Sequence, residues 1–487
     1  MTRTRVGILA ILLVAAIVAG VFLWPRPSAR AVYGAPRVAG AEVTTESALA
    51  VAGGDEEALA LQVSGALYTS APVVALTTPG DLDDAAAALA GLRVPLLLAP
   101  VSGPEEDVRA EIERLGASHV VTFGADLPDG VDLPTIPAGQ LKAGEPGAPV
   151  FALVADETTA ERVAPLLSPV SGQALVVAED PRGSVDTVAA LADSPDPTIL
   201  TVGDLATDED FQWKLETVLT GVELPGGGQL VAPGKLYVAL YGHPGSSALG
   251  VLGEQGVEAT IERARQHAAP YESLTDMTVV PSLEIIATIA SAGPGADGNY
   301  SAEAPIETLR PLVDAAAENG LYVVLDLQPG RTDFLTQAKL YEELLALPHV
   351  GLALDPEWRL KPDQVHLRQI GSVAIDEVNQ VVNWLADFTR ERRLPQKVLI
   401  LHSFRVSMTP EIDRLDTSRD ELAIVMHVDG QGGQGAKQDT WRVLHDYAPN
   451  MPWWGWKNFY DEDTPAMLTP QQTIANVNPT PIFISYQ

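Results

Sequence analysis

The feature that most constrains the fold is a series of short apolar runs that recurs through residues 230–487. Runs such as Val398-Leu399-Ile400-Leu401 are apolar at consecutive positions, as expected of parallel strands buried on both faces. The runs are Leu236–Tyr241, Thr278–Leu283, Tyr322–Leu327, Gly351–Leu354, Val398–Leu401, Ala423–Val428, Trp454–Asn458 and Ile482–Ser485. Eight such strands in a segment of about 250 residues predict a (β/α)8 barrel.

Helical periodicity fills most of the gaps between these runs. The predicted helices are Val257–Ala268, Ile306–Asn319, Asp333–Ala346, Ile375–Arg392, Pro410–Leu415, Thr440–Tyr447 and Pro470–Asn476. The alternative is a doubly wound open sheet, which would want a glycine-rich phosphate turn after its first strand. Gly242-His243-Pro244-Gly245 does not have that pattern, so the barrel is favoured.

The first half of the chain contains an internal repeat. Its paired segments are Ala71–Val73 with Ala148–Val150, Asp81–Leu92 with Glu157–Leu167, Leu96–Ala99 with Leu175–Ala178, and Val121–Gly124 with Leu200–Gly203. Each copy follows the order strand, helix, strand, helix, strand, which predicts an α/β repeat domain with parallel sheets. A linker at Pro225–Gly228 separates the halves, so we expect domains at 32–224 and 230–487, joined by residues 225–229.

The N-terminus predicts a membrane anchor. Val6–Trp24 contains no charged residue and, as a helix, would span about 28 Å, close to the thickness of a bilayer core. Arg3 and Arg5 precede it, which favours a cytoplasmic N-terminus. We expect residues 1–31 to form a single-pass transmembrane helix with the body outside the cytoplasm. Cleavage as a signal peptide after Ala31 is the alternative and would give a secreted protein.

Composition limits the partners and the chemistry. The chain has no cysteine, which excludes disulfides, thiolate metal sites and a cysteine nucleophile. Its 64 acidic and 31 basic side chains give a formal charge of −33. This charge argues against nucleic acid and against adsorption to an anionic membrane surface. A neutral glycan, or an anionic wall polymer bridged by cations, remains a suitable partner.

The first half also resembles the cell-wall-binding repeat 2 family. Arg37-Val38-Ala39-Gly40-Ala41 followed by Thr45–Ala50 is similar to that family's opening segment. Asp81–Ala85, Pro95–Leu98 and Val121–Gly124 occupy the places of three later family segments. The resemblance covers about residues 37–205, although the family's usual double glycine is absent. It implies attachment to cell-envelope polymers, and the alternative is a spacer that holds the second domain away from the membrane.

Polar residues collect where the predicted barrel strands end, and the active sites of such barrels lie at that edge. The residues that we expect to bind substrate there are Tyr241, Glu284, Asp326, His402, His427 and Trp456. Carboxylates, imidazoles and indole faces together suit a sugar, whose C–H groups stack on aromatic rings while its hydroxyls form hydrogen bonds. The same cup would serve an enzyme or a non-catalytic carbohydrate-binding protein.

A pair of carboxylates follows the fourth predicted strand. Asp355 and Glu357 are two residues apart, so they share a face if the strand continues, and each raises the pKa of the other. The stretch Gly351–Trp358 resembles the fourth-strand signature of family 18 glycoside hydrolases, and Met426–Asp429 resembles that family's sixth-strand motif.

This resemblance implies three catalytic roles. Glu357 would protonate the glycosidic oxygen, Asp355 would orient the substrate's own N-acetyl group, and Asp429 would assist the acetamide. Trp456 would form the floor of the sugar subsite. The motif departs from the family at Val350, Ala353, Pro356 and Val428, which are not the residues usual at those positions.

Other uses of the cup remain open. Glu284, Asp326 or Glu357 could pair across the mouth as nucleophile and acid/base. His243, His402, His427 and Asp429 are possible metal ligands, but the first strand has no His-x-His pair, so we predict neither a metal nor another cofactor. The glycine-rich segment Gly430–Lys437 is expected to form a flexible lid.

Overall fold

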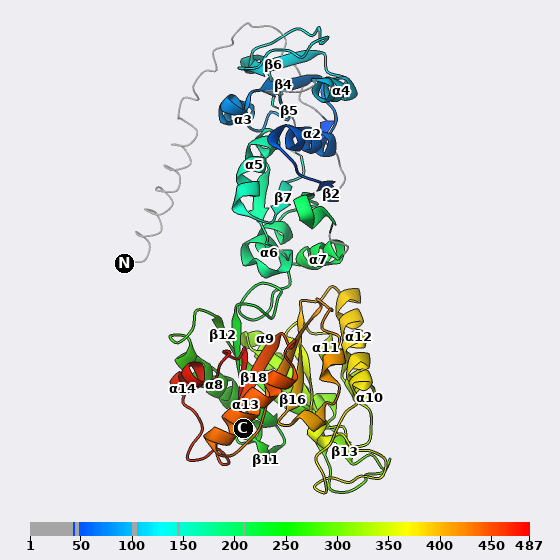
Figure 1. Cartoon of the computed structure of the whole chain (residues 1–487), viewed down its shortest axis with the longest axis vertical. Helices are drawn as coiled ribbons and strands as arrows, with labels where there is room; N and C mark the ends of the chain where they lie inside the picture. Colours follow the sequence, from blue (N-terminus) through cyan, green and yellow to red (C-terminus); the bar gives the residue numbers. More distant parts are fainter. Residues whose placement is uncertain (1–41, 44–47, 100–104, 144–146, 179, 208–209) are drawn as a thin grey trace, which may run out of the picture.

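The computed structural model describes residues 42–43, 48–99, 105–143, 147–178, 180–207 and 210–487. The predicted anchor at Val6–Trp24 lies outside these ranges. Within them, no helix has both the length and the apolar character needed to cross a bilayer. Figure 1 shows two lobes arranged end to end, an N-terminal α/β lobe and a C-terminal barrel.

The C-terminal lobe is a closed barrel. Within residues 230–487, all of which are described, eight parallel strands follow one another around it in chain order, and the last pairs with the first. They are β10 (Lys235–His243), β12 (Thr278–Ala290), β14 (Tyr322–Leu327), β15 (Val350–Leu354), β16 (Lys397–Ser403), β17 (Leu422–Val428), β18 (Trp453–Asn458) and β19 (Phe483–Tyr486). This confirms the predicted (β/α)8 barrel, because each apolar run forms one of these strands.

The barrel helices agree with the predicted ones, with three exceptions. The flanking helices are α8 (Val257–Ala268), α9 (Ile306–Asn319), α10 (Phe334–Lys339), α11 (Glu342–Leu345), α12 (Ile375–Glu391), α13 (Gln434–Tyr447) and α14 (Pro470–Asn476). The single helix predicted at Asp333–Ala346 is divided into α10 and α11. The helix predicted at Pro410–Leu415 is wrong, since only a 3-10 turn forms at Ile412–Arg414. Part of the predicted lid is also ordered, because α13 starts at Gln434.

Apolar side chains fill both layers of the barrel. Tyr237, Val324 and Ile400 belong to the core inside the strands, and their neighbours Val238, Leu325 and Leu401 pack outward under the helices. Both faces of each strand are therefore buried. The alternation along each strand decides which residues at its C-terminal end reach the barrel interior.

The N-terminal lobe contains two similar α/β units, which confirms the predicted repeat. The first unit orders its parallel strands β5-β4-β6, and the second has the corresponding order β8-β7-β9. The strands are β4 (Val73–Thr77), β5 (Leu96–Leu98), β6 (His119–Phe123), β7 (Val150–Val154), β8 (Gln173–Val176) and β9 (Thr198–Val202). The helices within the units are α3 (Leu82–Leu89), α4 (Glu106–Leu115), α5 (Glu157–Leu167) and α6 (Val185–Ala192).

One early strand joins the two units. β2 (Ala48–Val51) precedes the first unit in the chain but pairs with β9 of the second. α2 (Glu56–Leu67) then packs its buried face into the core that contains both β4 and β7. The two units consequently share one apolar core and form a single lobe.

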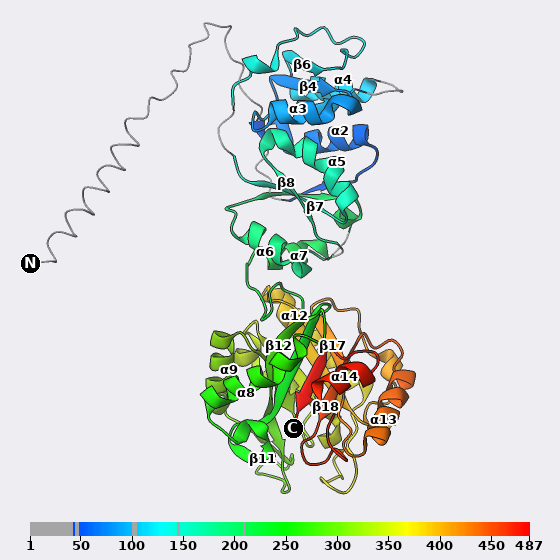
Figure 2. The same ribbon diagram turned by 90° about the vertical axis from the view of Figure 1, so that its left-hand side faces the viewer.

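The lobes meet at the N-terminal ends of the barrel strands. On α7 (Phe211–Val218), the Trp213 ring lies between two guanidinium groups, with Arg182 Cζ 4.3 Å and Arg390 Cζ 4.6 Å from its centroid. Lys214 forms an ion pair of 2.7 Å with Asp420, which lies two residues before the start of β17. Figures 1 and 2 show α7 facing α12 across this junction. The opposite, C-terminal end of the barrel therefore points away from the N-terminal lobe.

Two short antiparallel strands raise the rim at that free end. β11 (Ser246–Gly250) folds back on β10, and β13 (Ser301–Glu303) pairs with the far end of β12. A Cβ at Gly242, whose φ is +148°, would lie 2.7 Å from the Leu249 carbonyl oxygen, so this close return requires glycine. The rim on the side of β10 and β12 consequently stands above the rest of the barrel edge.

Candidate active site

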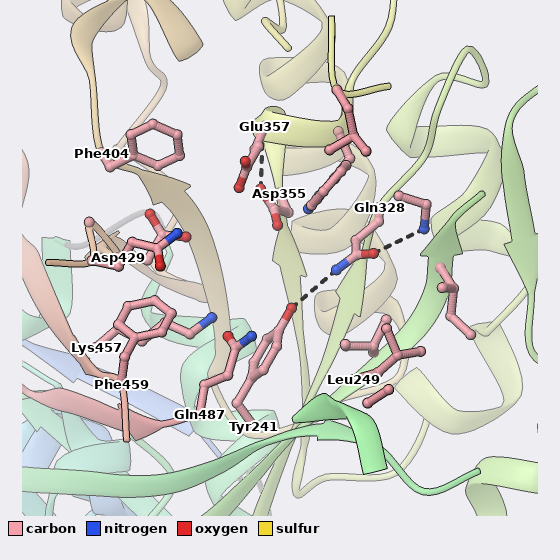
Figure 3. Close-up of a pocket in the computed structure, with 18 of the residues that line it drawn as sticks. Tyr241, Leu249, Gln328, Asp355, Glu357, Phe404, Asp429, Lys457, Phe459 and Gln487 are labelled. Atoms are coloured by element: carbon pink, nitrogen blue, oxygen red, sulfur yellow. Dashed lines mark hydrogen bonds between the residues drawn. The ribbon is translucent and has the colours of Figure 1, made fainter. Parts of the chain in front are cut away.

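A cavity of about 620 Å3 opens at the C-terminal ends of the barrel strands. Four residues that the sequence predicts for the site line it, and these are Tyr241, Asp355, Glu357 and Asp429. Tyr241 belongs to β10, Asp429 follows β17, and Asp355 caps the 3-10 turn Pro356–Trp358 by accepting from the Glu357 amide at 3.1 Å. Both members of the predicted carboxylate pair thus reach the cavity (Figure 3).

A second group of polar residues lies beneath the cavity floor. His402 is completely buried, and its Nε2 lies 2.7 Å from Glu284 Oε1 while its Nδ1 lies 3.0 Å from Asp429 Oδ2. Asp326 accepts a hydrogen bond of 2.9 Å from the Tyr241 hydroxyl. Glu284, Asp326 and His402 are therefore brought together as predicted, but as support for the cavity wall and not as its surface.

The buried imidazole determines the charge of its neighbours. Burial alone would lower the pKa of His402, but the carboxylates of Glu284 and Asp429 outweigh burial and raise that pKa well above its ordinary value. Burial alone would raise the pKa of Asp429, yet the hydrogen bond and charge of His402 hold it below its ordinary value. Asp429 is therefore an ionised carboxylate at the cavity, and the positive charge of the buried His402 balances its negative charge.

The other two cavity carboxyls favour their neutral forms. Burial raises the pKa of Asp355 well above its ordinary value, and Asp326 and Asp429 raise it further. Burial, followed by the charge of Asp429, raises the pKa of Glu357 to about 7. A cavity that holds one ionised carboxylate and one carboxylic acid with a pKa near neutrality has the parts needed for acid/base chemistry.

Lys457 was not among the predicted site residues but lies in the cavity. Its Nζ is 3.4 Å from the centroid of the Tyr241 ring, and its positive charge lowers the pKa of Glu357. The alternation of side chains along β18 could have identified it, because Lys457 shares a face with Gly455 and lies on the opposite face from Trp456. Phe404, Phe459 and Gln487 also line the cavity and were likewise missed.

Two predicted site residues lie elsewhere. Trp456 is completely buried outside the barrel, where it packs against Trp441 of α13, so the prediction that it forms the subsite floor is wrong. His427 points into the barrel below the cavity, and its Nε2 lies 2.7 Å from Ser485 Oγ. Burial, together with the charge of His402, lowers the pKa of His427 well below its ordinary value, so it is neutral.

The predicted metal ligands do not assemble, but another set lies close together. His243 Nδ1 is 2.9 Å from the Ile286 carbonyl oxygen, apart from the group around His402. Glu284, Asp326 and His402 each offer one possible ligand atom, and these atoms lie within 4.8 Å of one another. Because both nitrogens of His402 already contact carboxylates, the arrangement fits a hydrogen-bonded imidazolium better than a metal ligand.

Comparisons with known proteins assign the chain to no family. No family model and no curated protein matches the sequence. Among solved structures, 7,8-dihydropteroate synthase from Vibrio fischeri is similar at 12% identity, with 52% of this chain and 87% of that chain covered and a TM-score of 0.29.

Two glycoside hydrolases are also similar. Cellobiohydrolase II from Humicola insolens is 11% identical, with 40% of this chain and 57% of that chain covered and a TM-score of 0.19. A glycoside hydrolase family 6 enzyme from Coprinopsis cinerea is 9% identical, with 57% of this chain and 69% of that chain covered and a TM-score of 0.21. These distant similarities are to proteins with different activities, and they indicate no specific reaction.

Proposed function

We propose that the barrel is a glycoside hydrolase that acts on an N-acetylated glycan of the cell envelope. The observation that carries the proposal is the pairing of Glu357, whose pKa is raised to about 7, with the ionised Asp429 at one cavity. A glycosidase needs one carboxyl that gives a proton and another that remains charged. The environment of this cavity raises the pKa of Glu357 and lowers the pKa of Asp429, as these two roles require.

Glu357 is the general acid in this proposal. Its proton passes to the glycosidic oxygen as the bond between that oxygen and the anomeric carbon breaks. The acetamide oxygen of the same sugar then bonds to the anomeric carbon, so no enzymic nucleophile is needed. Water subsequently attacks that carbon, and the bond from the carbon to the acetamide oxygen breaks as the new C–O bond forms. The proton released by the water passes to the Glu357 carboxylate, which restores the acid.

Asp429 and Asp355 hold the acetamide. The ionised Asp429 accepts the acetamide N–H, and its charge stabilises the positive charge that develops on the ring formed by the acetamide. Asp355, which burial keeps in the neutral form, donates a hydrogen bond and orients the group. His402 contacts no substrate, and it acts by keeping Asp429 ionised.

The N-terminal lobe attaches the enzyme to the envelope in this proposal. The resemblance to cell-wall-binding repeats and the apolar segment Val6–Trp24 both support a membrane-anchored location with the body outside the cytoplasm. The cavity opens at the barrel end opposite the N-terminal lobe, so an envelope polymer can reach it while that lobe is held.

The test is hydrolysis by the full chain. Chitin oligomers and peptidoglycan glycan strands are incubated with the wild type, with Glu357→Gln and with the control Glu258→Gln, which changes an exposed glutamate on α8. We expect the wild type and the control to release reducing ends, and Glu357→Gln to be slower by about a hundredfold to ten-thousandfold.

Two other outcomes each overturn a part of the proposal, the first hydrolysis itself and the second the role of Glu357. If all three proteins bind the glycans and none releases reducing ends, the barrel is a non-catalytic carbohydrate-binding domain. If all three release reducing ends at the same rate, Glu357 is not the acid.

A further inference from the structure

We propose that the cavity takes a neutral glycoside whose sugar is joined to an apolar chain, so that the sugar meets the carboxyls and the chain lies on an apolar wall. This inference rests on the proposed function and names the class of its substrate. Figure 3 shows Leu249 across the cavity from Asp429 and Lys457, with Asp355 and Glu357 at a third side. One cavity therefore has a charged half and an apolar half.

The apolar wall comes from the raised rim. Ala248 and Leu249 of β11, together with Ile286, Ile289 and Ala290 of β12, line the cavity there. None of these five side chains can form a hydrogen bond, and the two strands that carry them both pair with β10. A second sugar would leave its hydroxyls without partners along this wall, whereas a hydrocarbon chain would not.

A β-bulge turns one of these side chains toward the cavity. In the pairing of β12 with β14, Ile286 is opposite Asp326 and Thr288 is opposite Leu327, so Ala287 is an extra residue. Regular alternation would place Ile289 on the outer face, opposite to that of Ile286. The bulge brings both isoleucines to the cavity, and such bulges are typical where a side chain is re-aimed beside a functional site.

Leu367 completes the wall from the loop that follows β15. It lines the cavity, and yet 89% of its surface is exposed. Its φ of +62° is a conformation that a leucine adopts only under strain. The loop is fixed on both sides of Leu367, since His366 Nε2 lies 2.9 Å from the Tyr300 carbonyl oxygen and Arg331 Nη2 donates to Gln364 O at 2.9 Å. An apolar chain in the cavity would cover this leucine.

The charges of the cavity decide the kind of head group. Asp429 is ionised, Glu357 and Asp355 are acidic groups beside it, and Lys457 is the cation among the cavity-lining residues that the structure describes. A phosphate or pyrophosphate between sugar and chain would be repelled by the ionised Asp429, with Lys457 as the one cation among the described lining residues to balance it. The head group is therefore an uncharged sugar, directly linked to its chain.

The test is a chain-length series measured by binding. Methyl, butyl, hexyl and octyl N-acetyl-β-glucosaminides are titrated, below their micelle concentrations, into full-length Glu357→Gln, which slows turnover. We expect the affinity to rise by about fourfold for each methylene that the wall buries. Adding Leu249→Ser and Leu367→Ser should flatten this rise, so that the ratio of octyl to methyl affinity falls toward one. Leu340→Ser, at an exposed leucine directly after α10 and outside the cavity, should keep the rise.

Three results would overturn the inference. These are equal affinities from methyl to octyl, a rise that persists in the Leu249→Ser/Leu367→Ser protein, and equally tight binding of octanol without a sugar. A failure of the proposed function is measured in a separate experiment with the wild type. It has failed if the wild type releases no sugar from these glycosides or from chitin oligomers. The binding series does not depend on turnover.

Discussion

His402 Nε2 lies 2.7 Å from Glu284 Oε1, and neither side chain has any exposed surface. The contact holds a positive charge below the cavity, and the second nitrogen of the same ring presents that charge to Asp429 at 3.0 Å. The three carboxyl groups that line the cavity consequently differ in protonation. Asp429 favours its ionised form, while Asp355 and Glu357 favour their neutral forms. The chemistry available to the cavity thus depends on a pair of residues that substrate does not touch.

The pH profile of hydrolysis should have a wide plateau that ends near neutrality. The raised pKa of Glu357, about 7, means that the acid loses its proton above pH 7, and kcat/KM should then fall about tenfold per pH unit. The pKa of Asp429 is lowered from 3.8, so loss of its charge should affect the rate only below about pH 4. Initial rates across the pH range check this, and a rate that increases through pH 7 would contradict it.

Replacing the buried imidazole should destabilise the fold. His402→Leu leaves the carboxylates of Glu284 and Asp429 buried without a partner, which should cost about 3–5 kcal/mol of unfolding free energy. The raised pKa of His402 makes its contribution complete below pH 6.5 and lost as pH rises through its folded-state pKa. The lowered pKa of Asp429 makes its contribution complete above about pH 4 and lost at lower pH.

The cost of His402→Leu should therefore be largest between about pH 4 and pH 6.5. Urea denaturation of both proteins at several pH values measures it. His366→Leu, at a half-buried histidine of the cavity rim, is the control. A cost for His402→Leu that is independent of pH would show that packing, and not charge, is what the imidazole contributes.

Asp355→Asn should stabilise the protein while reducing its activity. Because the folded-state pKa of Asp355 is raised, ionisation opposes folding once the pH exceeds the unfolded-state value of this carboxyl. Asparagine keeps the oxygen that accepts from the Glu357 amide and removes the charge. We expect a gain of about 1 kcal/mol at pH 8 and no gain at pH 3, measured by thermal or urea unfolding. A loss of stability at pH 8 would contradict the raised pKa.

The junction between the lobes should depend on one ring. Trp213→Ala removes the contact with Arg390 across the junction, which should contribute about 1 kcal/mol to it, and also the contact with Arg182 inside the N-terminal lobe. We expect faster proteolysis within residues 225–229 and separate thermal transitions for the two lobes. Gln212→Ala, at an exposed position of the same helix, should leave both measurements unchanged. Equal proteolysis of the two variants would show that the polar contacts of the junction, such as the ion pairs of Lys214 with Asp420 and of Arg393 with Glu216, suffice.

The sequence predicted the barrel well because its strands are apolar on both faces. A run such as Val398–Leu401 therefore identifies a strand, although it does not show which residues face the barrel interior and which face the helices. The same property prevented a correct choice at β18, where either Trp456 or Lys457 had to face the interior. Asp355 and Glu357 were placed correctly because a strand end limits where the next residues can go. The position of Ile289 at the cavity could not be predicted, because the bulge at Ala287 changes the alternation and depends on pairing with a distant strand.

The cation in the cavity should set the upper pH limit of the reaction. Lys457 lowers the pKa of Glu357, so Lys457→Met should raise that pKa and move the alkaline limb of the kcat/KM profile to higher pH. Lys361→Met, which changes an exposed lysine on the loop after β15, should leave the limb in place. Because the direction of the shift follows from the sign of one charge, a limb that moves to lower pH in Lys457→Met would mean that the titrating group is not Glu357. An unmoved limb in that variant would mean that solvent screens Lys457 from the acid, although its Nζ lies 3.4 Å from the centroid of the buried Tyr241 ring.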